Sequence, residues 1–229
     1  MEILPTANFQ PDISLWGFRI GEPVIALTSL LVALFCFYAW QRLGKAKSAD
    51  DAARLFNVFF LLMGFSSLLG GLVGHAFMHQ LPFVFKVPGW ALGMIAVSAL
   101  EQVSILRAAP FLGGRWGRVL SWANIVQLTV ALWFMFATLW FPAVEIHSAV
   151  GLLLVVAPLE SMLLLRFRSE VSRFVLWGIA VLVVAVSMHI FKISASVWLS
   201  YFDIAHLWMC GAIWLFMQGA LRLGKAGQA

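Results

Sequence analysis

The chain has 229 residues, of which 62% are hydrophobic, 14% aromatic and only 11% charged. One water-soluble core cannot bury that much apolar surface, so the composition excludes a soluble globular domain and indicates an integral membrane protein. The net charge is +5. The basic residues are not interleaved with exposed aromatic residues on a soluble surface, so we expect no nucleic acid partner.

Seven apolar segments follow one another along the chain, separated by short charged connections. A hydrocarbon core about 30 Å thick requires roughly 20 apolar residues per helix. The sequence therefore predicts an all-α bundle of seven transmembrane helices over 23–222, after an extracytoplasmic segment over 1–22 and before a cytoplasmic tail over 223–229. The predicted helices are 23–41, 55–79, 88–108, 117–140, 144–166, 173–192 and 202–222.

The basic residues predict the orientation, because loops rich in Lys and Arg stay on the cytoplasmic side of a membrane. Only Arg19, Lys86 and Lys192 fall on one side, whereas twelve fall on the other. We therefore expect the N-terminus outside and the C-terminus in the cytoplasm of a bacterial inner membrane. Glu2 and Asp12 precede any basic residue, and no small-residue cleavage site follows the first apolar segment, so this segment is expected to remain as a helix. The twelve residues are Arg42, Lys45, Lys47, Arg54, Arg107, Arg115, Arg118, Arg166, Arg168, Arg173, Arg222 and Lys225.

The second predicted helix ends in the run GGLVGHAFMH. Its small residues would let the backbone of a neighbouring helix come close. His75 and His79 are four residues apart, and in a helix this spacing points both imidazoles in one direction, as in a site where two histidines hold a metal ion. His79 also lies near enough to the predicted membrane surface to be a solvated residue at a helix end.

A second polar set lies deeper in the predicted membrane, toward the cytoplasm. A charged group at such a depth costs at least a few kcal/mol unless it is paired or neutralised, so these residues should face the interior. An interhelical hydrogen-bond network with one or both acids protonated is the favoured interpretation. A proton relay toward the histidines is the alternative, and Arg107 could bind lipid headgroups. The set is Glu101, Gln102, Asn124, Gln127 and Glu160.

The last predicted helix begins with Asp203 and His206, and a spacing of three stacks the carboxylate beside the imidazole. Asp203 could cap the helix. It could equally be a ligand, an acid/base partner or an orienting group for His206. His189, late in the sixth helix, and His147, early in the fifth, complete five histidines at one predicted depth. We expect His147 to be interfacial.

This layout resembles the CREST superfamily, which includes alkaline ceramidases and the progestin and adiponectin receptor-like proteins. The resemblance implies a zinc ion held by His75 and His206. Gly71 stands at the family's serine position, Asp203 replaces a second histidine of the last helix, and Glu101 is the acid of the third helix. The run FDIAH is also similar to an uncharacterised bacterial seven-helix family, which implies no known activity.

The leading hypothesis is a membrane-embedded, metal-dependent hydrolase that acts on a lipid or amide near the outer leaflet. Zinc would be bound by His75 and His206 with His79, His189 or Asp203, and would activate a water molecule. Asp203 would be the general base if it is not a ligand. The alternatives are an electron-transfer subunit that binds haem or copper, and a noncatalytic subunit of a larger complex. Expected partners are membrane lipids and other membrane proteins.

Overall fold

The computed structural model describes residues 10–45 and 50–226. Residues 1–9, 46–49 and 227–229, and with them Glu2 and Lys47, lie outside the described part. It confirms an all-α integral membrane protein with seven spans that are long and apolar enough to cross a membrane. The elements are α1 (Pro23–Lys45), α2 (Asp51–Leu69), the π-helix η1 (Gly70–Ala76), the 3-10 helix η2 (Phe83–Lys86), α3 (Val87–Leu112), α4 (Gly114–Thr138), α5 (Pro142–Val150), the π-helix η3 (Gly151–Val156), α6 (Ala157–Phe167), α7 (Glu170–Ile190) and α8 (Tyr201–Ala226).

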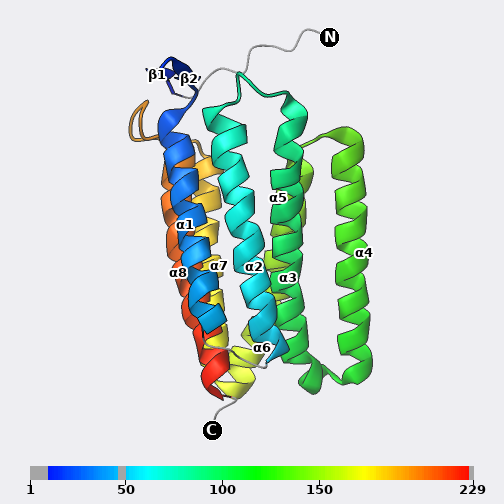
Figure 1. The fold of residues 1–229 in the computed structure, drawn as a ribbon. Coiled ribbons are helices and arrows are strands. Elements are labelled where there is room, and N and C mark those ends of the chain that lie inside the picture. Colours follow the sequence, from blue (N-terminus) through cyan, green and yellow to red (C-terminus); the bar gives the residue numbers. More distant parts are fainter. Residues whose placement is uncertain (1–9, 46–49, 227–229) are drawn as a thin grey trace.

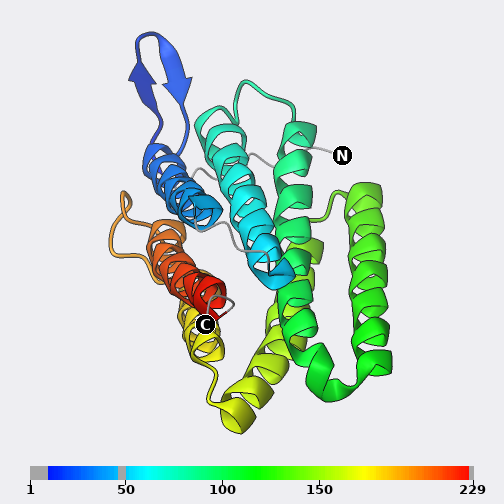
Figure 2. The same ribbon diagram turned by 60° about the horizontal axis from the view of Figure 1, so that its bottom comes forward.

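The helices form a closed arrangement with one helix outside it. Each span packs against the next around a ring: α1 against α2, α2 against α3, α3 against the span α5–η3–α6, α6 against α7, α7 against α8, and α8 back against α1. The helix α4 packs mainly against α3 and α5, and stands at the edge of the bundle (Figure 1 and Figure 2). Only 11% of the most apolar part of α4 is buried inside the protein, compared with 44% of the same part of the last span. Its large exposed side chains, such as Trp122 and Trp133, therefore face lipid.

The main core lies between α1, α2, α3, α7 and α8 and is rich in phenylalanine. Phe56, Phe60 and Phe216 are among the largest fully buried side chains. Gly178 on α7 permits close packing, because a Cβ atom there would lie 2.4 Å from the ring of Phe216 on α8. Burial of these side chains away from both lipid and water depends on such close approaches between helices.

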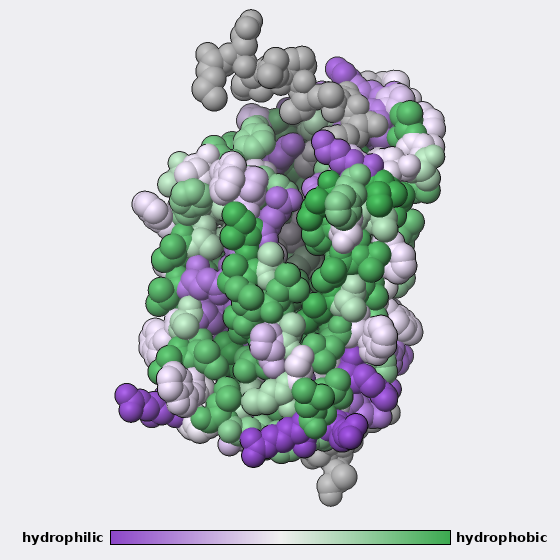
Figure 3. Space-filling model, turned by 180° about the vertical axis from the view of Figure 1, so that it is seen from behind, coloured by the Kyte–Doolittle hydropathy of each residue, from purple (hydrophilic) through white to green (hydrophobic). Residues whose placement is uncertain are grey.

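The molecule has two polar ends separated by an apolar band, and Figure 3 shows this on its rear face. One end, here called the hairpin end, carries two short strands, β1 (Ile13–Leu15) and β2 (Phe18–Ile20). The other, the arginine end, includes the end of α8 near the C-terminus (Figure 1). The predicted orientation would place the hairpin end outside the cell.

The antiparallel hairpin is an element that the hydropathy pattern did not predict. Ile13 pairs with Ile20, and the turn between the strands holds Trp16 and Gly17 at φ values of 49° and 83°. Two consecutive positive φ angles are typical of the tight turns that match the twist of a two-stranded ribbon. The hairpin leads directly into α1, so it places the polar N-terminal residues over the helix ends.

The second span also differs from its prediction. It does not continue as a regular α-helix to residue 79, because it changes to the π-helix η1 at Gly70 and ends at Ala76. His75 lies on the π-helix, whereas His79 lies in the following turn. The prediction that both imidazoles lie one α-helical turn apart is therefore wrong. Single π turns occur frequently at functional sites, and this one carries a predicted site residue.

Candidate functional site

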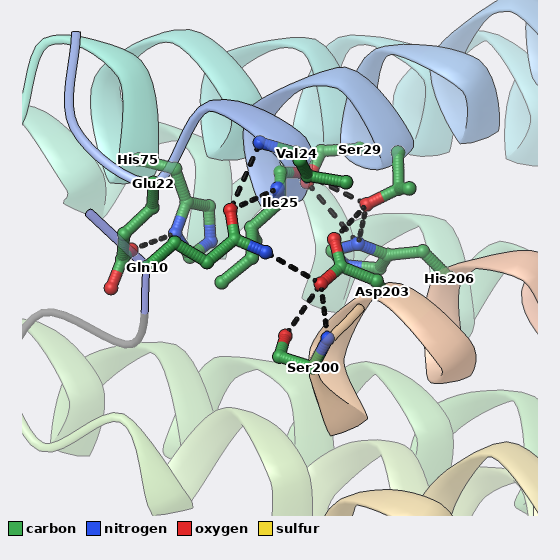
Figure 4. Close-up of polar contacts among 10 residues, drawn as sticks. Gln10, Glu22, Val24, Ile25, Ser29, His75, Ser200, Asp203 and His206 are labelled. Atoms are coloured by element: carbon green, nitrogen blue, oxygen red, sulfur yellow. Dashed lines mark hydrogen bonds and ion pairs between the residues drawn. The ribbon is translucent and has the colours of Figure 1, made fainter. Parts of the chain in front are cut away.

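Asp203 is the centre of a buried polar cluster at the hairpin end (Figure 4). Its side chain is fully buried at the start of α8. Oδ2 accepts hydrogen bonds from the backbone N–H of Ser200 at 2.7 Å, the Ser200 hydroxyl at 2.6 Å and Gln10 Nε2 at 2.8 Å. The contact with the Ser200 backbone is the return half of a capping box. Asp203 therefore caps α8 and also holds the N-terminal segment against the bundle.

Thr28 on α1 connects Asp203 to His206. Thr28 Oγ1 lies 3.1 Å from Asp203 Oδ1 and 3.0 Å from His206 Nδ1. The hydroxyl has one proton, and the carboxylate is its strongest acceptor. We therefore assign the Thr28 O–H as donor to Asp203 and the His206 Nδ1–H as donor to Thr28. In this tautomer Nε2 of His206 carries the lone pair.

His75 is paired directly with a carboxylate. Its Nδ1 lies 2.7 Å from Glu22 Oε2, and the Glu22 side chain is only 4% exposed. Glu22 has φ of 43°, a left-handed conformation that costs free energy in a residue with a side chain. The backbone N–H of Gly21 donates to the carbonyl of Ala76 at 2.9 Å, which ties this segment to the end of η1. Because both segments are held in this way, Nδ1 is the nitrogen of His75 that faces Glu22.

His79 belongs to a more exposed cluster on the hairpin. Its Nε2 lies 3.3 Å from Asp12 Oδ2, which also pairs with Arg19. Burial alone would raise the pKa of Asp12, but the hydrogen bonds and charges of Arg19 and His79 together lower it below its ordinary value of 3.8. This cluster joins β1, β2 and the turn after η1 without involving His75 or His206.

His189 approaches the same region from α7. Its Nε2 lies 3.6 Å from Glu145 Oε1 on α5. The ring of Phe202 on α8 lies 4.8 Å from the His189 ring and 6.0 Å from the His75 ring, between centroids. His206 follows Phe202 by one helical turn on the same side of α8. His75 and His189 therefore lie beside the face of α8 that carries Phe202 and His206, which brings three of the four predicted metal ligands into one region.

His147 does not belong to this layer, and the prediction that it is interfacial is wrong. Its side chain is buried, with Nε2 3.1 Å from the carbonyl oxygen of Met94 and Nδ1 3.4 Å from Gln127. The helix α5 begins at the level of the hairpin end but turns His147 toward α3 and α4. A histidine that bonds two helices in this way has a structural role in packing.

The described residues do not form a three-ligand metal centre. Over residues 10–45 and 50–226, no three side chains of histidine, cysteine, aspartate or glutamate are grouped so that they could hold one ion. His75, His79 and His189 instead each have a different carboxylate partner. As arranged, this donor set does not fit zinc, which needs at least three protein ligands around one point.

The deeper polar residues form two structural networks that connect neighbouring helices, which confirms the interhelical hydrogen bonds of the favoured interpretation. Arg107 forms an ion pair with the fully buried Glu160, whose Oε1 also accepts a hydrogen bond from Ser104 at 2.8 Å. The alternative that Arg107 binds lipid headgroups is therefore wrong. Between α3 and α4, the Asn124 side chain bonds the hydroxyl and the carbonyl of Ser98.

Several residues of the site were not found from the sequence, among them Ser200, Glu22, Gln10 and Thr28. Gln10 connects the N-terminal segment to Asp203, and its Oε1 accepts from the N–H groups of Val24 and Ile25 at the start of α1. Thr28 lies in an apolar segment with no charged neighbour in the sequence. The N–H groups at the start of every helix need acceptors, but the hairpin separates Gln10 from α1 in the sequence, so nothing there indicated that Gln10 would provide one.

The chain belongs to a family of unknown function, DUF6962, whose model matches residues 24–225. No curated protein and no solved structure matches the chain. The matched range covers all seven spans and includes His75, Asp203 and His206, but excludes Gln10 and Glu22. The seven apolar spans make the chain a seven-helix membrane protein, and no match links it to the CREST superfamily.

Proposed function

We propose that the hairpin end carries the active site of a membrane-embedded hydrolase that acts on a lipid or amide near the outer leaflet. In this proposal Nε2 of His75 and Nε2 of His206 are the atoms that transfer protons. The supporting observation is that Nδ1 of each imidazole is held by a carboxylate, directly by Glu22 for His75 and through Thr28 for His206. Such an arrangement fixes the tautomer and makes Nε2 more basic.

Two imidazoles of this kind suit general acid–base hydrolysis. One Nε2 would take a proton from the attacking water, and the other, protonated, would give a proton to the leaving group. Phe202 lies beside His75 and on the same side of α8 as His206, so an acyl chain would find an apolar contact between them. A substrate anchored in lipid would reach the histidines at the polar end of the apolar band.

Asp203 takes a different part in this proposal from that of a general base. Oδ2 accepts hydrogen bonds from Gln10 and Ser200 and Oδ1 accepts one from Thr28, so both oxygens are already engaged by the protein. We assign it as the positioning residue that orients Thr28 and, through Thr28, His206. This proposal assigns no step to zinc, haem or copper and uses only the described side chains.

Hydrolysis of an N-acyl aminomethylcoumarin in mixed lipid–detergent micelles tests the proposal. The purified protein should release the coumarin, and His75→Gln and His206→Gln should each lower the rate by about 10²–10⁴-fold, the usual contribution of a general acid or base. His147→Gln is the matched control, since this histidine lies outside the layer. Absence of release by the wild type, or equal rates in all three variants, would overturn the proposal. Metal analysis of the same samples tests the zinc hypothesis separately.

A further inference from the structure

Glu101 on α3 is the most unusual charged residue of the membrane-spanning part. Its side chain is fully buried, and neither carboxyl oxygen has a hydrogen-bond partner among the residues that the structure describes. A carboxylate without a partner in a hydrocarbon environment is strongly unfavourable. Glu160 provides an internal comparison, because it is equally buried but forms an ion pair with Arg107 and accepts from Ser104.

The surroundings of Glu101 are built to fit its carboxyl group. Gly151 faces it at the first residue of η3, and a Cβ atom there would lie 2.3 Å from Oε1 and 2.8 Å from Cδ of Glu101. The side chain of Val97 also borders this position. A glycine at the start of a π-helix therefore leaves room for the carboxyl group where any other residue would displace it.

The ionisable groups on the packed elements are already engaged. His147, one turn before Gly151, contacts Met94 and Gln127. Arg107 and Glu160, toward the arginine end, pair with each other. The described parts of α2 and α4 contribute no charged side chain at this depth. No described cation therefore neutralises Glu101.

We propose that Glu101 is a proton-binding site within the membrane. Its side chain is a neutral carboxylic acid that can release its proton and take one up again. A proton suits the site better than a metal cation, because a cation such as Ca²⁺ needs six or more oxygen ligands, whereas a proton needs only the carboxyl group.

Dicyclohexylcarbodiimide, an apolar reagent that modifies protonated carboxyl groups, tests the site in the full-length protein in lipid nanodiscs. Mass spectrometry should find the adduct on Glu101 and not on Glu160, and labelling should fall as the pH is raised. Labelling of both glutamates alike, or of neither, would overturn the proposal. Protection by sodium chloride but not by choline chloride would also overturn it, in favour of a cation site.

Infrared spectroscopy provides a second readout that does not depend on the reagent. The carbonyl stretch of a protonated carboxylic acid should be present in the wild type at neutral pH, retained in Glu160→Gln and lost in Glu101→Gln. If Glu101→Gln does not fold, the comparison between Glu101 and Glu160 in the labelled wild type still decides. Retention of the whole band in a folded Glu101→Gln protein would contradict the proposal.

Discussion

Nδ1 of His75 lies 2.7 Å from Oε2 of Glu22, and these two residues come from segments 53 positions apart. The pair joins the residue just before α1 to the π-helix at the end of the second span. Because the Glu22 side chain is 4% exposed and its backbone is left-handed, both partners are held in one geometry before any ligand arrives. Such preorganisation is what an acid–base residue requires.

Breaking the contact between His75 and Glu22 should lower the free energy of unfolding, and the loss from one substitution should be smaller when the other partner is already replaced. Glu22→Gln and His75→Ala should each destabilise the protein, and the double variant should cost less than their sum, with a coupling free energy of about 1 kcal/mol. The measurement is a double-mutant cycle of unfolding in detergent. Glu145→Gln with His189→Ala is the comparison, because 3.6 Å separates a more exposed pair there. Equal coupling in the two cycles would contradict the special status of His75.

Asp203→Asn should destabilise the protein by about 1–3 kcal/mol, because an amide replaces one acceptor with a donor facing buried donors. Gln10 and Ser200 would then compete for a single oxygen. Asp50→Asn is the matched control. Asp50 also caps a helix, accepting from the N–H of Ala52 at 2.7 Å, and Asn caps as well as Asp. Thermal unfolding of both variants makes the comparison, and similar losses would contradict the central role of Asp203.

The attachment of the hairpin should depend on pH through Asp12. Its pKa in the folded protein is below 3.8, despite the opposing effect of burial, because Arg19 and His79 stabilise the carboxylate. A lowered pKa means that the stabilisation is present above the ordinary pKa and is lost as the pH falls through the folded value. The protection of residues 12–20 against hydrogen exchange, measured relative to the intrinsic rate at each pH, should therefore persist at pH 5 and fall below about pH 4. Asp12→Asn should exchange faster at neutral pH and lose this acid dependence, and an unchanged profile would refute the assignment.

Removing Arg107 should be among the most damaging changes at the arginine end. Arg107→Leu leaves the fully buried Glu160 without its cation, and such a loss costs about 3–5 kcal/mol. Adding Glu160→Leu should restore part of the stability, because no unpaired charge then remains. The free energies of unfolding of the two variants give the test. A double variant less stable than Arg107→Leu alone would show that the pair itself stabilises the fold.

The depth of a residue in the membrane could be predicted from the sequence, but the residues that it contacts could not. Hydropathy and basic residues report how far a residue lies along a span, so His75, Asp203 and His206 were expected in one layer, and the seven spans are confirmed. The contacts of that layer come partly from Gln10 and Glu22, which flank the hairpin on either side. Their positions depend on the hairpin and on the backbone bond from Gly21 to Ala76.

The π-helices mark a second limit of sequence reasoning. One extra residue in a turn does not alter composition or hydropathy, so the pattern GGLVGHA is as typical of an α-helix as of a π-helix. The prediction that His75 and His79 share one face depended on regular α geometry, and it failed for this reason. His147 failed differently. A helix end predicts nearness to the surface, whereas the packing of α5 on α3 buries the side chain.

The two π turns also give the chain an unusual dependence on exact length. Each residue of a regular α-helix advances the direction of the side chains by 100°. Removing one residue from 70–76 would let the span close into a regular helix and swing its end by about that angle. His75 would then leave Glu22, although no side chain of the pair had changed. For η3 the same deletion would rotate Gly151, which faces Glu101, relative to α6 and Glu160. In both spans the register of the backbone, as much as the identity of the residues, determines which groups meet.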